Sequence, residues 1–180
     1  MTLLDQMMAV VTPHRSAEDR AGARAGAGAL AAGCGWLSEV IRQHAAIEQA
    51  LEGLRVAPRG PDRRHALQWL AELLTGHSLA EQAVLYPALS LECRRAHAAA
   101  AYADESSLKI ELAALQTMAL SDADFHDKLE RLSADLVFHI HEEESHWFPA
   151  LARGLDTETH AALSARFLAE FRRYMGADAD

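Results

Sequence analysis

Four stretches of the chain carry apolar residues at alternating steps of three and four, and histidine or glutamate interrupts each stretch at a core-facing position. Such spacing is typical of helices that pack side by side, whereas period-two alternation of Val, Ile and Thr is absent. Short connections with proline or polar residues separate the stretches, so consecutive helices should be antiparallel neighbours. The sequence therefore predicts an all-α protein built as an antiparallel up-down four-helix bundle.

Prolines and polar clusters set the boundaries of these helices. The four bundle helices are expected at about 36–56, 62–90, 95–119 and 121–152. Pro87 should kink or end the second helix, because proline lacks the backbone N–H that a helix needs. An additional C-terminal helix is expected at about 158–175, which makes 36–176 the bundle domain.

Residues 1–35 are expected to form a separate N-terminal segment. Within residues 3–11, leucine, methionine and valine fall at helical spacing and predict a short helix. This helix either packs on its own domain or pairs chains into a homo-oligomer. The Ala/Gly-rich residues 13–35 read as a loosely ordered linker.

Six polar residues occupy positions within the apolar stripes. They are His44, His77, Glu81, Glu105, His139 and Glu143. Burying an uncompensated carboxylate or imidazole costs on the order of several kcal/mol, and three carboxylates in one core repel each other. Bound cations would neutralise the carboxylates and use the imidazole lone pairs. The pattern therefore predicts a metal site on which all four helices converge.

An internal repeat strengthens this prediction. The segment from His77 to Pro87-Ala-Leu matches the segment from His139 to Pro149-Ala-Leu at a constant offset of 62 residues. The first and third helices repeat at an offset of 61, which aligns His44 with Glu105. Two hairpins related by a pseudo-two-fold would give each metal one ligand from the first or third helix and one histidine from the second or fourth. Glu81 and Glu143 would then be free to bridge.

With these residues, about 36–152 of the chain resembles the hemerythrin-like (HHE cation-binding) family. The resemblance implies a non-haem di-iron centre with two iron ions. Five of the six positions match the ligands of the family: His44, His77, Glu81, His139 and Glu143. Members serve in oxygen binding, iron or oxygen sensing, nitric oxide or peroxide chemistry, and iron handling. Iron follows from the resemblance alone, since mixed His/Glu sites also accept manganese and zinc.

The third helix departs from the pattern of the oxygen-carrying members. They place HxxxH where this chain has Glu105 and Lys109. A carboxylate-richer set of ligands donates more charge and suits activation of oxygen or peroxide better than reversible carriage. Glu105 is either a ligand or is salt-bridged to Lys109, in which case one metal would lack a ligand.

Other polar and aromatic residues lie close to these six in the sequence. His146 extends the stripe of the fourth helix, either as a further ligand or as a pocket-lining group. His141, Glu142 and Glu144 are expected on a solvated face, with support of the metal ligands as the alternative. Three aromatic residues should close the end of the bundle: Tyr86, Trp147 and Phe148.

Composition restricts the partners and the location. The net charge of −9 argues against nucleic acid and anionic membranes. No run of about 18 apolar residues is free of charge, and the first residues lack a positive region, so we expect a cytoplasmic protein.

Three functions fit these constraints, and no catalytic residue beyond the expected ligands stands out. One is a di-iron redox protein that takes a small diatomic or peroxide ligand, and another is a non-catalytic module that senses or buffers iron or oxygen. The third is a metal-free helical interaction domain.

Overall fold

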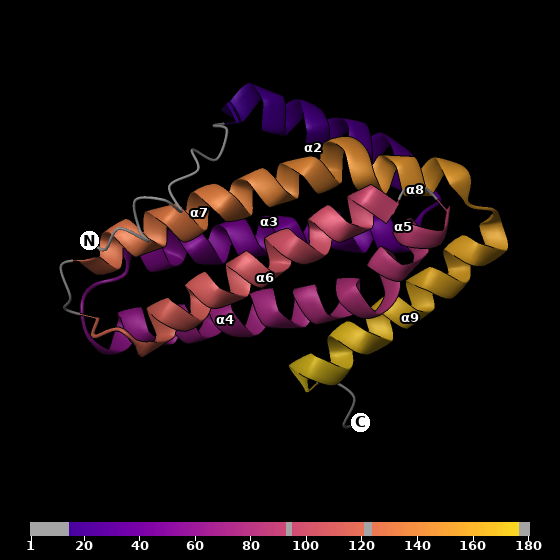
Figure 1. Cartoon of the computed structure of the whole chain (residues 1–180). Coiled ribbons are helices and arrows are strands. Elements are labelled where there is room, and N and C mark those ends of the chain that lie inside the picture. Colours follow the sequence, from indigo (N-terminus) through magenta and orange to yellow (C-terminus); the bar gives the residue numbers. More distant parts are fainter. Residues whose placement is uncertain (1–14, 93–94, 121–123, 177–180) are drawn as a thin grey trace.

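The structure, a computed structural model, describes residues 15–92, 95–120 and 124–176, and all regular structure in these ranges is helical. Figure 1 shows the arrangement. The elements are α2 (Ala17–Ala31), α3 (Gly35–Val56), α4 (Pro61–Ala80), η1 (Glu81–Leu85), α5 (Tyr86–Glu92), α6 (Arg95–Thr117), α7 (Asp124–Glu142), η2 (Glu143–Trp147), α8 (Phe148–Gly154) and α9 (Thr157–Met175).

The four long helices α3, α4, α6 and α7 lie alongside one another, and α3 packs on α4 as α6 packs on α7 (Figure 1). The predicted all-α four-helix bundle with an additional C-terminal helix is therefore confirmed. The bounds of α3 and α6 differ from the expected ones by at most two residues. Residues 3–11, with the expected amphipathic helix, lie outside the described ranges. In the described ranges, no helix is long and apolar enough to cross a membrane.

The second and fourth helices each contain one π-helical turn, η1 and η2, directly before an aromatic residue and a proline. In these turns the Tyr86 N–H donates to the Glu81 carbonyl, and the Phe148 N–H donates to the Glu143 carbonyl, five residues earlier. The wider turn lets each helix continue past its proline, where an ordinary turn would be kinked or ended. Pro87 therefore does not end the second helix, which continues to Glu92.

The core divides into two apolar clusters with a polar layer between them. One cluster includes Ile47, Leu74, Leu108 and Leu136, and the other includes Val40, Val84, Ala101 and Trp147. On each of the four helices, the predicted His and Glu positions fall between residues of the two clusters. The polar layer is thus covered on both sides by apolar side chains.

Residues 17–31 form the helix α2, although the composition of residues 13–35 predicts loose order. Ser16 and Asp19 form a capping box, in which each side chain accepts a hydrogen bond from the other residue's backbone N–H. Such a cap satisfies N–H groups that the first turn leaves unpaired. α2 packs against α3, α7, η2 and α8, and crosses one side of the bundle (Figure 1).

Helix α9 packs across α3 and α4 on another side of the bundle. Its approach to α4 depends on Gly76, because a Cβ atom there would lie 2.9 Å from Cδ1 of Tyr174. At its other end, His160 accepts a hydrogen bond of 3.0 Å from Nε1 of the buried Trp36. His160 thus helps to pack α9 against Trp36 of α3.

Candidate metal centre

The structure brings all six predicted residues together in the polar layer, and each is at most 2 % exposed. Their ligand-type atoms form two overlapping groups in which all atoms lie within 4.8 Å of one another. The first group is His44, His77, Glu81 and Glu143, and the second is Glu81, Glu105 and His139. The first takes its histidines from α3 and α4, and the second takes its residues from α6 and α7 together with Glu81.

The two carboxylates that follow the repeated histidines lie between these groups. Oε2 of Glu143 lies 3.1 Å from Nε2 of His44, and its Oε1 lies 3.5 Å from Nε2 of His139. Oε1 of Glu81 lies 3.3 Å from Nε2 of His77 and 4.0 Å from Nε2 of His44. Nε2 of His139 also lies 3.3 Å from Oε1 of Glu105. The three histidines therefore turn their Nε2 atoms toward the same carboxylates.

The other ring nitrogen of each histidine faces an acceptor. Nδ1 of His44 lies 2.9 Å from Oε1 of Glu144, and Nδ1 of His77 lies 2.9 Å from Oε1 of Gln43. Nδ1 of His139 faces Oδ2 of Asp104 at 3.6 Å. The acceptors at Nδ1 of His44 and His77 are at hydrogen-bond distance, so they fix the ring orientation and leave the Nε2 lone pair available, as metal-binding histidines require. The contact of His139 with Asp104 is longer than a hydrogen bond.

These supporting residues follow the same pseudo-two-fold as the six. Gln43 precedes His44 and contacts His77, just as Asp104 precedes Glu105 and contacts His139. Glu144 follows Glu143 and contacts His44, whereas its counterpart Gln82 donates to Glu105 at 3.4 Å. The repeat thus extends to the layer around the polar centre.

Neutral groups hold one oxygen of the Glu105 carboxylate. Its Oε2 accepts hydrogen bonds from Ser78 Oγ and Gln82 Nε2, while Lys109 donates to Oε1 of Gln82 at 3.0 Å. Within the described ranges no ion pair joins Lys109 to Glu105, so the alternative of a Glu105–Lys109 salt bridge is wrong. Oε1 of Glu105 remains directed at His139.

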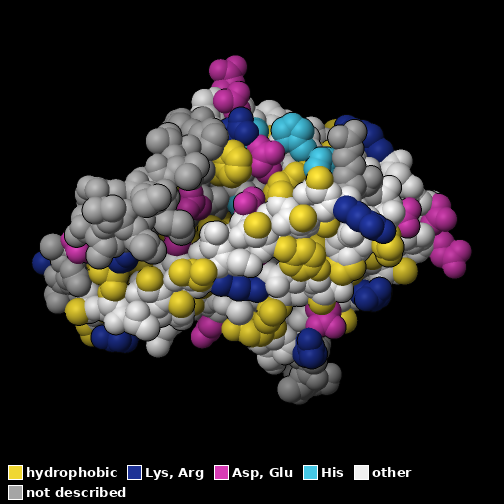
Figure 2. All heavy atoms as spheres, viewed as in Figure 1, with side chains coloured by type: hydrophobic (Ala, Val, Ile, Leu, Met, Phe, Trp, Pro, Cys, Tyr) yellow, Lys and Arg dark blue, Asp and Glu magenta, His cyan; other side chains and the backbone are white. Residues whose placement is uncertain are grey.

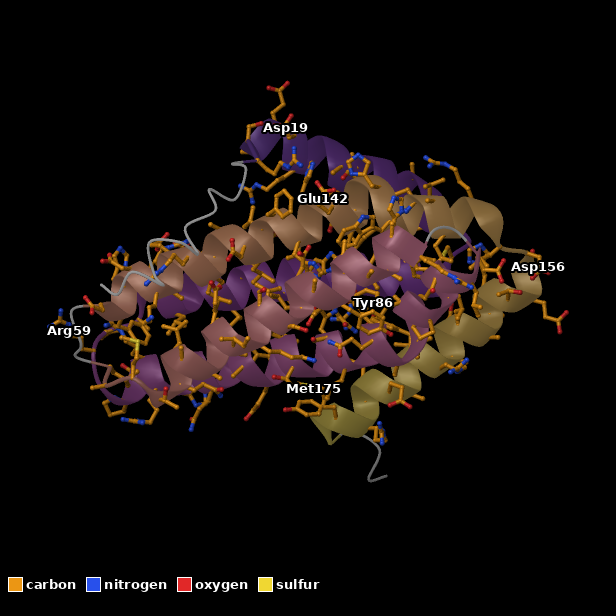
Figure 3. All side chains as sticks on the ribbon, in the orientation of Figure 1. Asp19, Arg59, Tyr86, Glu142, Asp156 and Met175 are labelled. Carbon is orange, nitrogen blue, oxygen red and sulfur yellow. The ribbon has the colours of Figure 1, made fainter. Side chains whose placement is uncertain are left out.

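Tyr86 lies at the centre of the layer, and Figure 3 shows it inside the bundle. Its hydroxyl donates to Oε1 of Glu143 at 2.8 Å and lies 3.2 Å from Oε2 of Glu81 and 3.3 Å from Nε2 of His139. The sequence indicated only that Tyr86 closes the bundle end. Since η1 adds one residue to the turn, the position five residues after Glu81 faces the site, and the repeat sets Phe148, without a hydroxyl, at the equivalent place.

The buried ionisable groups of this centre shift one another's pKa values. Burial and the neighbouring carboxylates of Glu143 and Glu105 raise the pKa of Glu81 well above its ordinary value. Burial and the nearby His44 and His139 lower the pKa of His77 well below its ordinary value. Burial alone would lower the pKa of His139 too. The carboxylates of Glu143 and Asp104 outweigh burial and raise the pKa of His139 well above its usual range. A cation between these carboxylates would relieve the conflict that keeps them from ionising together.

The residues fit a bound metal in both atom type and direction. Nε2 of His44, Oε1 of Glu81, Oε1 of Glu105 and Oε2 of Glu143 are buried and have no hydrogen-bond partner in the described part of the chain. Buried polar atoms are rarely left without a partner, because each costs about 1–3 kcal/mol. Imidazole and carboxylate are the donors that iron, manganese and zinc share.

Residues 37–151 match the family model of the hemerythrin HHE cation binding domain. The chain belongs to this family. The match spans α3 to α8 and contains all six residues of the polar centre, while α2 and α9 lie outside it. No curated protein and no solved structure matches the chain. The resemblance to the hemerythrin-like (HHE cation-binding) family, which the sequence motifs indicated, is therefore confirmed.

Some residues that neighbour the six candidate ligands in the sequence are buried, and others are exposed. Glu144 and His141 are buried, so their expected place on a solvated face is wrong, and Glu144 instead supports His44. Both are off the stripe, and the packing of α2 over this face covers them. His146 is exposed and belongs to neither group of ligand-type atoms.

An open cleft of about 700 Å³ lies beside the second group. It is lined by His97, Asp104, Phe138, Glu142, His146, Trp147 and Arg153, among others. His146 thus lines this surface cleft, with an exposed ring. In the face of the molecule that Figure 2 shows, acidic and histidine side chains gather near the upper edge. Asp104 and Trp147 line the cleft and also lie next to the ring of His139 in the polar layer.

Proposed function

We propose that the HHE domain holds a non-haem di-iron centre that binds or activates a small oxidant: oxygen, peroxide or nitric oxide. The first iron would take His44 and His77, the second would take Glu105 and His139, and Glu81 and Glu143 would lie between them. This assignment uses the six residues that the sequence predicts as ligands. Bound iron would supply the electrons and the coordination position that such an oxidant needs.

The observation that carries the proposal is the direction of the buried donor atoms. Three Nε2 atoms and the oxygens of three glutamates converge in one buried layer, and several of them have no hydrogen-bond partner in the described part of the chain. A metal-free interaction domain would have to leave these atoms unpaired at a cost that one or two cations remove. The donor arrangement therefore favours the metal-binding functions over the metal-free alternative.

The chain's own residues prepare the centre for a small ligand. Glu144 and Gln43 orient the imidazoles of His44 and His77, and Asp104 lies beside that of His139. Apolar clusters cover the layer on both sides. Tyr86 keeps a hydroxyl directed at Glu143, where it can donate a hydrogen bond to an oxygen atom in the layer. The cleft at Asp104 and Trp147 gives a small molecule a short approach to His139.

Rapid mixing of the iron(II)-loaded protein with oxygen, hydrogen peroxide or nitric oxide tests this function. We expect the iron absorption spectrum to change with at least one of the three, and the change to be lost in Glu105→Gln. A loaded protein whose spectrum responds to none of them would contradict the redox function. It would leave iron sensing or buffering as the function of the same centre.

A further inference from the structure

Helix α2 lies outside the part of the chain that matches the family, and its own sequence makes it a weak helix. It contains Gly22, Gly26 and Gly28, and a Cβ atom at any of them would meet nothing within 4 Å. Packing does not require these glycines, and each costs about 1 kcal/mol of helix stability relative to alanine. Only Ala27 of α2 is fully buried. Leu30 and Ala31, at its C-terminal end, are half-buried and pack on the core, and the rest of the helix is joined to the bundle mainly by polar contacts.

Three arginines make these polar contacts. Arg15 donates to Glu142 at 2.6 Å, and Arg20 lies 3.5 Å from Glu48. Figure 3 shows Glu142 on the side of α7 toward α2. Arg24 makes the densest set, with one hydrogen bond to Glu48 at 2.7 Å and three to Glu144 at 2.9 to 3.1 Å. Such forked contacts between guanidinium and carboxylate are stronger than neutral hydrogen bonds and fix the orientation of the carboxylate.

Arg24 reaches the metal centre through one side chain. Glu144 is 2 % exposed and accepts hydrogen bonds from Arg24 on one side and from Nδ1 of His44 on the other. The opposite ring nitrogen of His44 faces Glu143 and Glu81. A residue of α2 is thus separated from a proposed iron ligand by a single buried carboxylate.

From this chain of contacts we propose that docking of α2 and metal occupancy of the centre are coupled through Arg24. The inference rests on the proposed metal centre. Arg24 neutralises Glu144 and fixes its orientation, and Glu144 in turn fixes the tautomer and ring orientation of His44. An undocked α2 leaves Glu144 without this partner and weakens metal binding. Because coupling between two sites is reciprocal, a bound metal stabilises the docked helix by the same free energy. Helix α2 therefore acts as an element that closes when the centre is loaded.

Metal affinity of matched arginine variants provides the first test. In competition with a chelator, Arg24→Ala should bind iron(II) about 10–100-fold more weakly than wild type, the range for loss of a residue that supports a metal ligand. Arg20→Ala is the control, because it removes the same charge from the same helix without touching Glu144. Arg24→Lys, which keeps the charge but cannot form the fork, should give an intermediate loss. Equal affinities of Arg24→Ala and Arg20→Ala would overturn the inference.

Hydrogen exchange of the backbone of residues 17–31 supplies a readout that does not depend on activity. Iron loading should slow exchange in this segment of wild type and of Arg20→Ala, but not in Arg24→Ala. Unchanged exchange on loading of a wild-type protein that does bind iron would overturn the coupling and leave the proposed function standing. A wild-type protein that takes up no iron would instead contradict the proposed function itself, and the inference with it.

Discussion

Tyr86, in one half of the internal repeat, donates a hydrogen bond of 2.8 Å to Glu143, in the other half. Burial and the carboxylates of Glu143 and Glu81 raise the pKa of Tyr86 well above its ordinary value, so the hydroxyl stays protonated as a donor. Phe148 occupies the equivalent position of the other half. The two halves thus differ at this pair and at His44 and Glu105, which would make the two proposed metal positions chemically distinct.

Tyr86→Phe removes the hydroxyl without changing the ring. Because the hydroxyl is a donor to a buried carboxylate, we expect the free energy of unfolding of the metal-free protein to fall by about 2 kcal/mol. The metal content should stay that of wild type, since Tyr86 is outside the proposed ligand set. Denaturant unfolding and metal analysis check the two expectations. Tyr102→Phe is the control, as its hydroxyl bonds a backbone carbonyl near the surface, and an equal loss there would contradict a special role of Tyr86.

Gln43→Ala tests the support of His77. The side chain of Gln43 is fully buried and is the acceptor at Nδ1 of His77. Its removal frees the ring to change orientation, so we expect a 10–100-fold loss of iron(II) affinity in chelator competition. The exposed Gln68 on α4 offers a matched Gln68→Ala control, which should bind as wild type does. Undiminished affinity in Gln43→Ala would mean that the His77 ring is held by packing alone.

Glu105→Gln distinguishes the two metal positions. The amide keeps the shape and its hydrogen bond with Ser78 but loses the charge that Glu105 directs at His139. We expect the metal content to fall from about two to about one per chain, because the first group of ligands is untouched. Asp104→Asn, one residue away, should retain both metals with lower affinity for one. A Glu105→Gln protein with both metals would show that Glu105 is not a ligand.

A carboxyl pair away from the centre should make stability depend on pH. Burial and the neighbouring Asp135 raise the pKa of Glu111 to about 7 in the folded chain. A raised pKa favours folding while the group is protonated, so this contribution is present below pH 4.5 and is lost as pH rises through 7. Glu111→Gln should therefore gain stability over wild type between pH 5 and pH 8. Since Glu111 is partly exposed, we expect a gain of about 1 kcal/mol after solvent screening.

Thermal unfolding at the two pH values measures this gain. Glu72→Gln, at an exposed position of α4, is the control and should show no such dependence. A Glu111→Gln protein whose advantage is the same at pH 5 and pH 8 would contradict the assignment.

The bundle and its polar layer could be predicted because both depend on periodicity and on the repeat. His44, His77 and His139 fall on stripes whose neighbours are apolar, and this placement alone puts them in the core. The family resemblance rested on the same residues. On each helix, the spacing of these residues along the sequence fixes which of them share a face, because α-helical geometry is regular.

The supporting residues could not be predicted in the same way. Glu144 is off the stripe, and its burial depends on α2, whose glycine-rich sequence conceals a well-formed cap at Ser16. Tyr86 faces the centre because a π-helical turn shifts the register by one residue, which a period of 3.6 does not anticipate. The first feature arises from contacts between segments that are distant in the sequence, and the second from a local departure from α-helical geometry.

The central claim is that the six polar residues hold two metal ions. Elemental analysis of the purified protein, beside a His77→Ala/His139→Ala double variant, tests it most directly. We predict about two metal ions per wild-type chain, iron among them, and their loss in the double variant, because each proposed position loses a histidine. A folded wild-type chain that contains no metal, even after anaerobic loading with iron(II), would contradict the account.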